Sequence, residues 1–194
     1  MPAVQVAIHD PLNQLQGLRA ALAGNGIAVV DESAGKAVWL CSLLDASAKA
    51  KLAQGGTVLL LVGGREALPP GGQLQIAPRA GSDLAGDWVN NFNWVLSSSP
   101  LWKPLSPVID SSILGWEAAS VTPEYVIEGL QDPQDVLAGV FYGWLNVNRG
   151  YLADVRQGPG RMLVTTFRFQ GYGHDPFATM LLHQMLIIAA SGKT

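Results

Sequence analysis

The sequence predicts an α/β fold: a three-layer sandwich with a mainly parallel sheet, helices on both faces, and a C-terminal β-hairpin followed by a helix. Short β-rich runs alternate with helical segments along the first 62 residues. These runs are apolar on both faces, which is typical of parallel strands covered by helices on both sides. The length suits one domain with a sizeable core, so we expect residues 1–194 to form a single domain.

The first third of the chain predicts two successive β-α-β units. Leucines recur at helical spacing from position 12 to position 22, and Gly24 or Gly26 ends that helix. A second helix is expected over residues 46–54, with Asp45 or Ser47 as its N-cap. The strands of these units are expected over residues 4–8, 27–30, 36–44 and 57–62.

The last third predicts further strands and a terminal helix. Residues 124–130 and 136–145 are expected to be strands, and residues 151–169 a hairpin that turns at QGPG. Asp175 is the expected N-cap of the terminal helix, with Pro176 in its first turn.

Between these ordered parts lies a long irregular segment over about residues 63–115. It is rich in proline, serine and glycine and contains Trp88, Trp94 and Trp102. An irregular stretch of this length in a compact domain is typically a functional element or an interface. A short helix is expected inside it, over residues 83–96. The simplest structural role for its aromatic side chains is to cover the edge of the sheet.

Composition excludes several classes of protein. The formal net charge is −3 and the basic residues are scattered, so no nucleic-acid partner is expected. Charged residues make up only 14% of the chain, which favours a module that buries part of its surface against another domain or subunit. The apolar run at 177–190 is too short to span a bilayer, and no signal-peptide pattern is visible. The cellular compartment stays open.

Metal and cofactor sites are not expected either. The single cysteine, Cys41, excludes an internal disulfide and a cysteine-rich metal site, and the three histidines lack metal-binding spacing. A flavodoxin-like cofactor binder is a further reading of the strand order. However, HDPLNQ after the first strand is no substitute for the Ser/Thr-rich phosphate loop that such a protein needs.

Four groups of polar residues follow predicted strands, where ligands bind in open parallel sheets. They are His9-Asp10, Cys41 with Asp45, Gly63-Gly64-Arg65, and His174-Asp175. A Cys–His–Asp set would suffice for acyl transfer, which makes Cys41, His174 and Asp175 candidates for a small cysteine hydrolase. Each also has an ordinary structural role. Cys41 lies in an apolar run, Asp10 and Asp175 suit helix caps, and His174 suits a solvent-facing loop. Arg65 would bind a carboxylate or sugar hydroxyl, or pair with Glu66 or with a neighbouring domain.

The order of segments resembles a known family. The first part reads as a strand, HDP, a helix, IAVV and AVWLCSLLDASAKAKLAQGGTVLLLVGG. The second part contains SPVIDSSILGWEAASVTPEYVIEGL, VLAGVFYGWL and GPGRMLVTTFRFQGYGHDPFATMLLHQML. Over nearly the whole chain this resembles the C-terminal class I glutamine-amidotransferase-like, flavodoxin-like domain of glycoside hydrolase family 2 enzymes, the β-galactosidase and β-glucuronidase type.

The resemblance implies where catalytic residues would stand. Active amidotransferases of this fold carry a Cys in a GxCxG turn after a central strand and a His-Pro-Glu motif after a late strand. The first position falls here on VGGRE at 62–66, and the second falls near Arg168 and Phe169, so neither catalytic type is present. HDP at 174–176 is similar to the second motif but displaced by several residues. No amidotransferase role is therefore carried over.

The resemblance implies a non-catalytic accessory domain that packs on other domains of a glycosidase or mediates oligomerisation. A glycosidase needs two carboxylates about 5 to 9 Å apart, which in that family lie on a separate barrel domain. A variant of this hypothesis has tryptophans forming a sugar-binding platform, which requires at least two of them to be exposed together. The tryptophans concerned are Trp88, Trp94, Trp102, Trp116 and Trp144. The alternative is the cysteine hydrolase or amidotransferase-like enzyme that uses Cys41 and His174.

Overall fold

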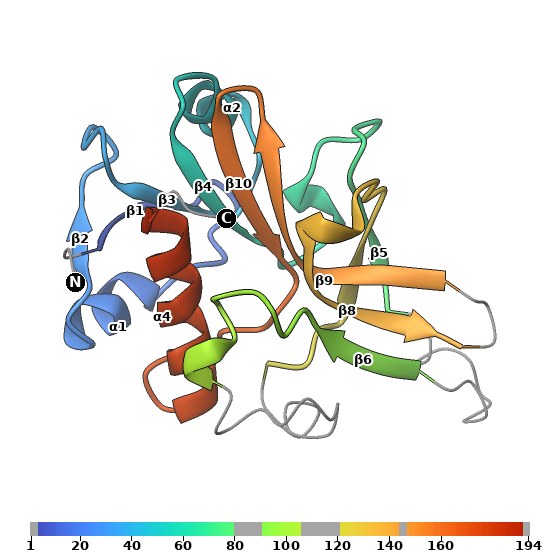
Figure 1. Ribbon diagram of the computed structural model, residues 1–194. Coiled ribbons are helices and arrows are strands. Elements are labelled where there is room, and N and C mark those ends of the chain that lie inside the picture. The colour runs from blue at the N-terminus through green and yellow to red at the C-terminus, as the bar shows by residue number, and fades with distance from the viewer. Residues whose placement is uncertain (1–3, 80–90, 106–120, 144–146, 192–194) are drawn as a thin grey trace.

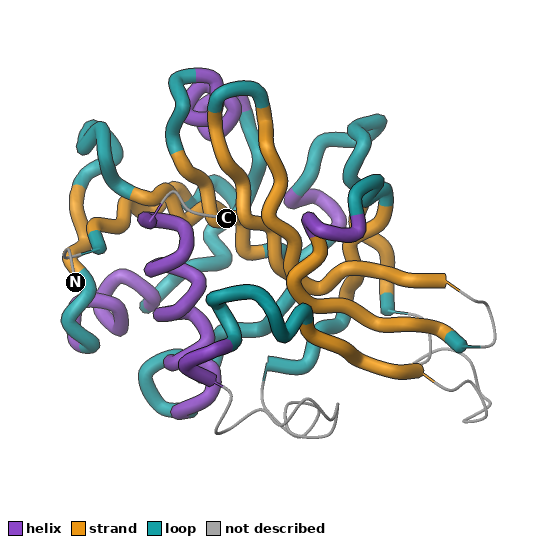
Figure 2. Tube along the Cα trace, viewed as in Figure 1, coloured by secondary structure: helices purple, strands orange, loops and turns teal. Residues whose placement is uncertain are grey.

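The computed structural model describes residues 4–79, 91–105, 121–143 and 147–191. These residues form one ten-stranded sheet with three α-helices. Figures 1 and 2 show how the helices lie around the sheet. The predicted α/β class, with helices on both faces and a C-terminal hairpin followed by a helix, is confirmed.

One half of the sheet is parallel. Its strand order is β2-β1-β3-β4-β10, and each neighbouring pair in this order runs parallel. The direction of winding changes at β1, which pairs with β2 on one side and with β3 on the other. The bounds are β1 Gln5–His9, β2 Ala28–Val30, β3 Val38–Cys41, β4 Thr57–Leu61 and β10 Gly160–Thr165.

The other half of the sheet is antiparallel and is organised around the long strand β9. This strand forms the predicted hairpin with β10, turning at Gly158, and it also pairs with β7 and β8. Beyond these, β5 pairs with β7 and β6 pairs with β8. The bounds are β5 Gln75–Pro78, β6 Asn91–Val95, β7 Tyr125–Glu128, β8 Val136–Tyr142 and β9 Val147–Gln157.

Two apolar layers cover the faces of the sheet. Helices α1 (Leu18–Gly24) and α4 (Pro176–Ser191) pack on one face, and α2 (Ala46–Ala53) packs on the other. Asp45 caps α2 by accepting a hydrogen bond from the N–H of Ala48, and Asp175 caps α4 in the same way through Ala178. Both predicted caps are therefore confirmed. Short 3-10 turns lie at Arg65–Ala67, Lys103–Leu105 and Pro133–Asp135.

The first helix is shorter than its leucine spacing predicts. The carboxylate of Asp10 accepts hydrogen bonds from the N–H groups of Gln14 (2.9 Å) and Leu15 (2.7 Å). Asn13 and Gly17 both have positive φ, which a continuous right-handed helix does not allow. Asp10 thus caps a turn that precedes α1, and the helix itself begins only at Leu18.

The helix predicted over residues 83–96 is wrong in its second half. Residues 91–95 form β6, which pairs with β8, and residues 83–90 lie outside the described part of the chain. The side chain of Asn93 is buried while that of Phe92 is 46% exposed. Alternation with a period of two is the pattern of a strand, and here it outweighs the helical interpretation.

Candidate functional site

A cleft of about 560 Å³ lies at the carboxyl ends of β4 and β10. Its walls come from the turn before α1 (Gln14), the end of β4 (Gly63), the segment after β10 (Arg168, Phe169) and the loop before α4 (His174). In a parallel sheet this edge is where ligands and catalytic groups gather. It is also the position that the family resemblance indicates for the amidotransferase machinery.

The turn after β4 is filled by polar side chains that bind one another. The Nε2 amide of Gln14 donates to the carboxylate of Glu66 at 2.9 Å. A Cβ atom on Gly63 would overlap the side-chain amide of Gln14, and one on Gly64 would overlap the carboxylate of Glu66. A side chain at either glycine therefore meets a pair that already occupies this space. Arg65 is exposed at the start of the 3-10 turn.

The segment after β10 carries an ion pair where the resemblance would place a catalytic histidine. Nη1 of Arg168 donates to Glu124 at 2.8 Å, and both side chains are largely exposed. Phe169 is buried in the core. His174 is exposed and lines the same cleft, whereas Asp175 is engaged as the cap of α4. The cleft is thus lined by the exposed imidazole of His174 and by the ion pair of Arg168 with Glu124.

The structure does not bring Cys41 and His174 together. Cys41 is fully buried in the apolar layer beneath α2. Burial, followed by the negative charges of Asp45 and Glu32, raises the pKa of its thiol far above the usual range. The cleft of His174 is walled by Leu18 and Phe169, which belong to the layer on the opposite face of the sheet. A protonated, enclosed thiol on the other face is no nucleophile for this cleft.

The structure describes two of the five tryptophans of the predicted sugar-binding platform. Trp102 is buried, and its indole N–H donates to the carbonyl of Leu137 at 2.8 Å, so it is a core residue. Trp94 is half-buried and lines a second cleft. Trp88, Trp116 and Trp144 lie outside the described residues.

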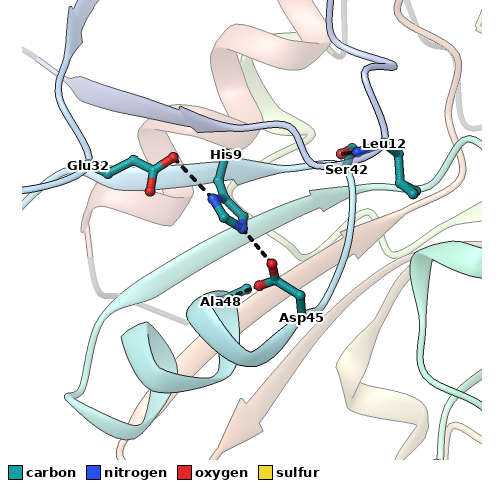
Figure 3. Close-up of polar contacts among 6 residues, drawn as sticks. All are labelled: His9, Leu12, Glu32, Ser42, Asp45 and Ala48. Carbon is teal, nitrogen blue, oxygen red and sulfur yellow. Dashed lines mark hydrogen bonds and ion pairs between the residues drawn. The ribbon is translucent and has the colours of Figure 1, made fainter.

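The sequence analysis named His9 and Asp45 separately but missed the cluster that they form with Glu32, at the point where the winding of the sheet changes direction. His9, at the end of β1, is hydrogen-bonded through Nδ1 to Glu32 and through Nε2 to Asp45, each at 3.0 Å (Figure 3). Glu32 follows β2 and Asp45 follows β3, so the cluster joins the carboxyl ends of three adjacent strands. The change of winding between β2, β1 and β3 is the signal that would have brought these residues together.

The charges of this cluster stabilise one another. Burial alone would lower the pKa of His9, but the hydrogen bonds and charges of Asp45 and Glu32 outweigh it, and the pKa is raised. Burial alone would raise the pKa of Asp45, but the N–H of Ala48 and the side chain of His9 outweigh it, and the pKa is lowered. Both ring nitrogens of His9 are hydrogen-bonded, so the imidazole links the segments that follow β2 and β3. The described residues contain no group of three side chains suited to a metal ion.

The sequence matches no protein-family model and no curated protein sequence. Within the described part of the chain, the helices fall short of the length and apolar character needed to cross a membrane.

Proposed function

We propose that this chain is a non-catalytic accessory domain of a carbohydrate-active enzyme, serving domain packing or oligomerisation and, in a variant of this role, sugar binding. The main support for the proposal is that side chains already fill the turn after β4. Gln14 and Glu66 occupy the space beside Gly63 and Gly64, at the position where an active member of the resembled family has its nucleophile.

Electrostatics supports the same conclusion. The thiol of Cys41 is buried and its pKa is raised by that burial, so almost none of it is thiolate near neutral pH. Three polar side chains of the first cleft are paired, Gln14 with the adjacent Glu66 and Arg168 with Glu124. Paired groups of this kind rigidify a surface and do not activate a nucleophile.

The surface also suits a packing role. Phe92 on β6 and Met180 on α4 are exposed apolar side chains, 46% and 37% accessible, and α4 contains no Asp, Glu, Lys or Arg. A helix without formal charges can be buried against another domain or subunit without the cost of desolvating a charge.

The size of the native protein tests the accessory role. An immunoblot of the source cells, with an antibody raised against this chain, is expected to give a band several times larger than 20.5 kDa. A single band near 20.5 kDa, with the purified chain monomeric by light scattering, would overturn the proposal.

Thiol chemistry tests the absence of catalysis by Cys41. The native chain should resist labelling by a maleimide and react only after unfolding in urea. Its release of ammonia from glutamine should equal that of the Cys41→Ser variant, which is a clean control because the chain has one cysteine. Rapid labelling of the folded protein together with an activity lost in Cys41→Ser would support the cysteine-hydrolase alternative.

A further inference from the structure

The connection between β2 and β3, residues 31–37, lies at the edge of the sheet and is mostly exposed. Among the described strands, β2 pairs with β1 alone, so the connection follows an edge strand of three residues. Its own backbone makes two turn hydrogen bonds, from the N–H of Ala34 to Asp31 and from the N–H of Ala37 to Ala34, at 3.0 and 3.1 Å. The position of the connection therefore depends on side-chain contacts with the rest of the domain.

Two such contacts join the β2–β3 connection to α2, one near each end of that helix. Near the first end, the imidazole of His9 bridges the carboxylate of Glu32 and that of Asp45, the N-cap of α2 (Figure 3). Near the other end, Nζ of Lys51 donates to the carbonyl of Gly35 at 2.9 Å. The connection is thus held against α2 at two points.

Trp39 of β3 lies between these two contacts. Its ring centroid is 5.2 Å from that of His9, and Nζ of Lys51 is 5.6 Å from the ring on another side. The indole N–H is buried and has no hydrogen-bond acceptor among the described residues. Buried donors of this kind are normally paired. Movement of the neighbouring connection would give this N–H access to water, so opening breaks no bond made by the indole N–H.

The two hydrogen bonds of His9 require two protons on its ring. Each ring nitrogen is 3.0 Å from a carboxylate oxygen, and an ionised carboxylate only accepts. A neutral imidazole has one N–H, so its other nitrogen would face a carboxylate without a proton between them. Asp45 is fixed by a further hydrogen bond from the N–H of Ala48, whereas Glu32 is 46% exposed and has no other polar partner among the described residues. The contact with Glu32 is therefore the one that is lost.

We propose that His9 is a pH-dependent switch: its doubly protonated ring holds the β2–β3 connection against α2, and loss of one proton releases Glu32 and lets the connection move away from Trp39. Burial lowers the pKa of His9, but the hydrogen bonds and charges of Asp45 and Glu32 outweigh burial, and the pKa is raised. The connection is therefore held below the ordinary imidazole pKa of about 6.5 and is released as the pH rises through the raised value.

The other titratable groups near the ring do not change this direction. Cys41, the partner of His9 in the β1–β3 register, is a buried thiol whose pKa is raised far above the usual range, first by burial and then by the charges of Asp45 and Glu32. The carboxylate of Asp10 is bound by two backbone N–H groups of the turn before α1. Lys51 faces Trp39 and Gly35 and holds the second contact.

Amide hydrogen exchange measured by NMR on the purified chain tests the switch. Between about pH 6 and about pH 8.5, after correction for intrinsic exchange rates, the protection of Ala34 and Ala37 should fall about threefold to tenfold, the worth of a half-exposed charged hydrogen bond. The amide of Leu59 in the central strand β4 should stay protected throughout. The ¹⁵N shifts of His9 should show two N–H groups below the transition and one, on Nε2, above it.

Glu32→Gln is the decisive variant because a Gln amide bonds to either form of the imidazole, accepting from an N–H or donating to a bare nitrogen. The pH-dependent loss of protection should disappear, and the pKa of His9 measured by NMR should be lower than in the parent protein. His9→Gln should also abolish the pH dependence. The matched control is His174→Gln, which alters an exposed imidazole of the first cleft and should keep the parent's profile. If His9→Gln unfolds the protein, Glu32→Gln decides, because that side chain lies outside the core.

Three results would overturn the inference. They are constant protection of Ala34 and Ala37 over this pH range in the parent protein, a fall in protection that persists in Glu32→Gln, or a simultaneous fall at Leu59, which would indicate general unfolding. The switch does not rest on the accessory role, so either proposal can fail while the other stands.

Discussion

Replacing Asp154 by Asn should destabilise the protein more than any surface substitution, because Asp154 is half of a buried ion pair. Nε of Arg161 donates to its Oδ1 at 2.8 Å, Nη2 donates to its Oδ2, and the side chains are only 3% and 7% exposed. Nη1 of Arg161 donates to the carbonyl of Ile188 at 2.7 Å, so the pair also fastens α4 to the hairpin of β9 and β10.

The magnitude follows from what the substitution leaves behind. Asn preserves the shape but removes the negative charge that faces the buried guanidinium of Arg161 through two hydrogen bonds, which costs about 3 to 5 kcal/mol. A chain of this size loses about 2 to 4 °C of melting temperature per kcal/mol, so the melting temperature should fall by roughly 6 to 20 °C. The exposed pair of Arg168 and Glu124 gives the scale for comparison, since breaking such a pair costs about 0.2 to 1 kcal/mol.

Urea unfolding followed by circular dichroism measures the difference. The double variant Arg161→Met/Asp154→Leu should be more stable than Asp154→Asn alone, because it leaves no uncompensated charge in the core. Arg168→Ala should remain close to the parent protein. If Asp154→Asn costs less than about 1 kcal/mol, or if the double variant is no better than the single one, the account of this pair as a buried charge clamp is refuted.

Three further outcomes are expected from the contacts described above. His9→Gln should destabilise the protein more at about pH 5.5 than at about pH 8.5 in urea titrations. The raised pKa of His9 means that its ion pairs stabilise the fold fully below the unfolded pKa of about 6.5 and are lost as the pH rises through the folded value, and equal losses would contradict this. Gly160→Ala should cost about 1 to 3 kcal/mol because its Cβ would overlap the backbone of Leu52. Gly63→Ala should cost less because only the flexible end of Gln14 must move, and the reverse order would be inconsistent with the packing described. Asp175→Ala should cost about 1 kcal/mol through loss of the α4 cap, seen as a lower urea midpoint; no change would mean that the cap is dispensable.

The parallel half of the fold could be predicted because its signals are local. The run at residues 57–62 is apolar at almost every position, which is the pattern of a strand buried on both faces and not of a strand with one exposed face. The capping residues Asp45 and Asp175 stand directly before the helices that they cap. The antiparallel half depends on pairings between distant residues. Trp94 and Gly139 are partners in the sheet, yet nothing in either local sequence specifies the other. The second half of the helix predicted over residues 83–96 was misassigned for the same reason.

The candidate sites show the same difference between local sequence signals and contacts between distant residues. The lack of a nucleophile in the turn after β4 was expected from VGGRE, but the pair of Gln14 and Glu66 that fills this turn was not. The cluster around His9 joins residues 23 and 36 positions apart, and each of them is ordinary in its own segment. Only the order of the strands brings these side chains to one edge.

The two clefts differ in what a ligand would have to displace. In the first, Gln14 is bound to Glu66 beside the cleft and Arg168 to Glu124 within its lining, so a ligand that binds Gln14 or Arg168 must compete with bonds already made. In the second, Trp94 and Phe141 lie on one face of the sheet, and the register places the paired side chains of Glu128 and Arg149 on the opposite face. A ligand packed against the two rings would leave that ion pair intact. Binding at the first cleft therefore has to break existing side-chain pairs, whereas binding against the aromatic rings of the second does not.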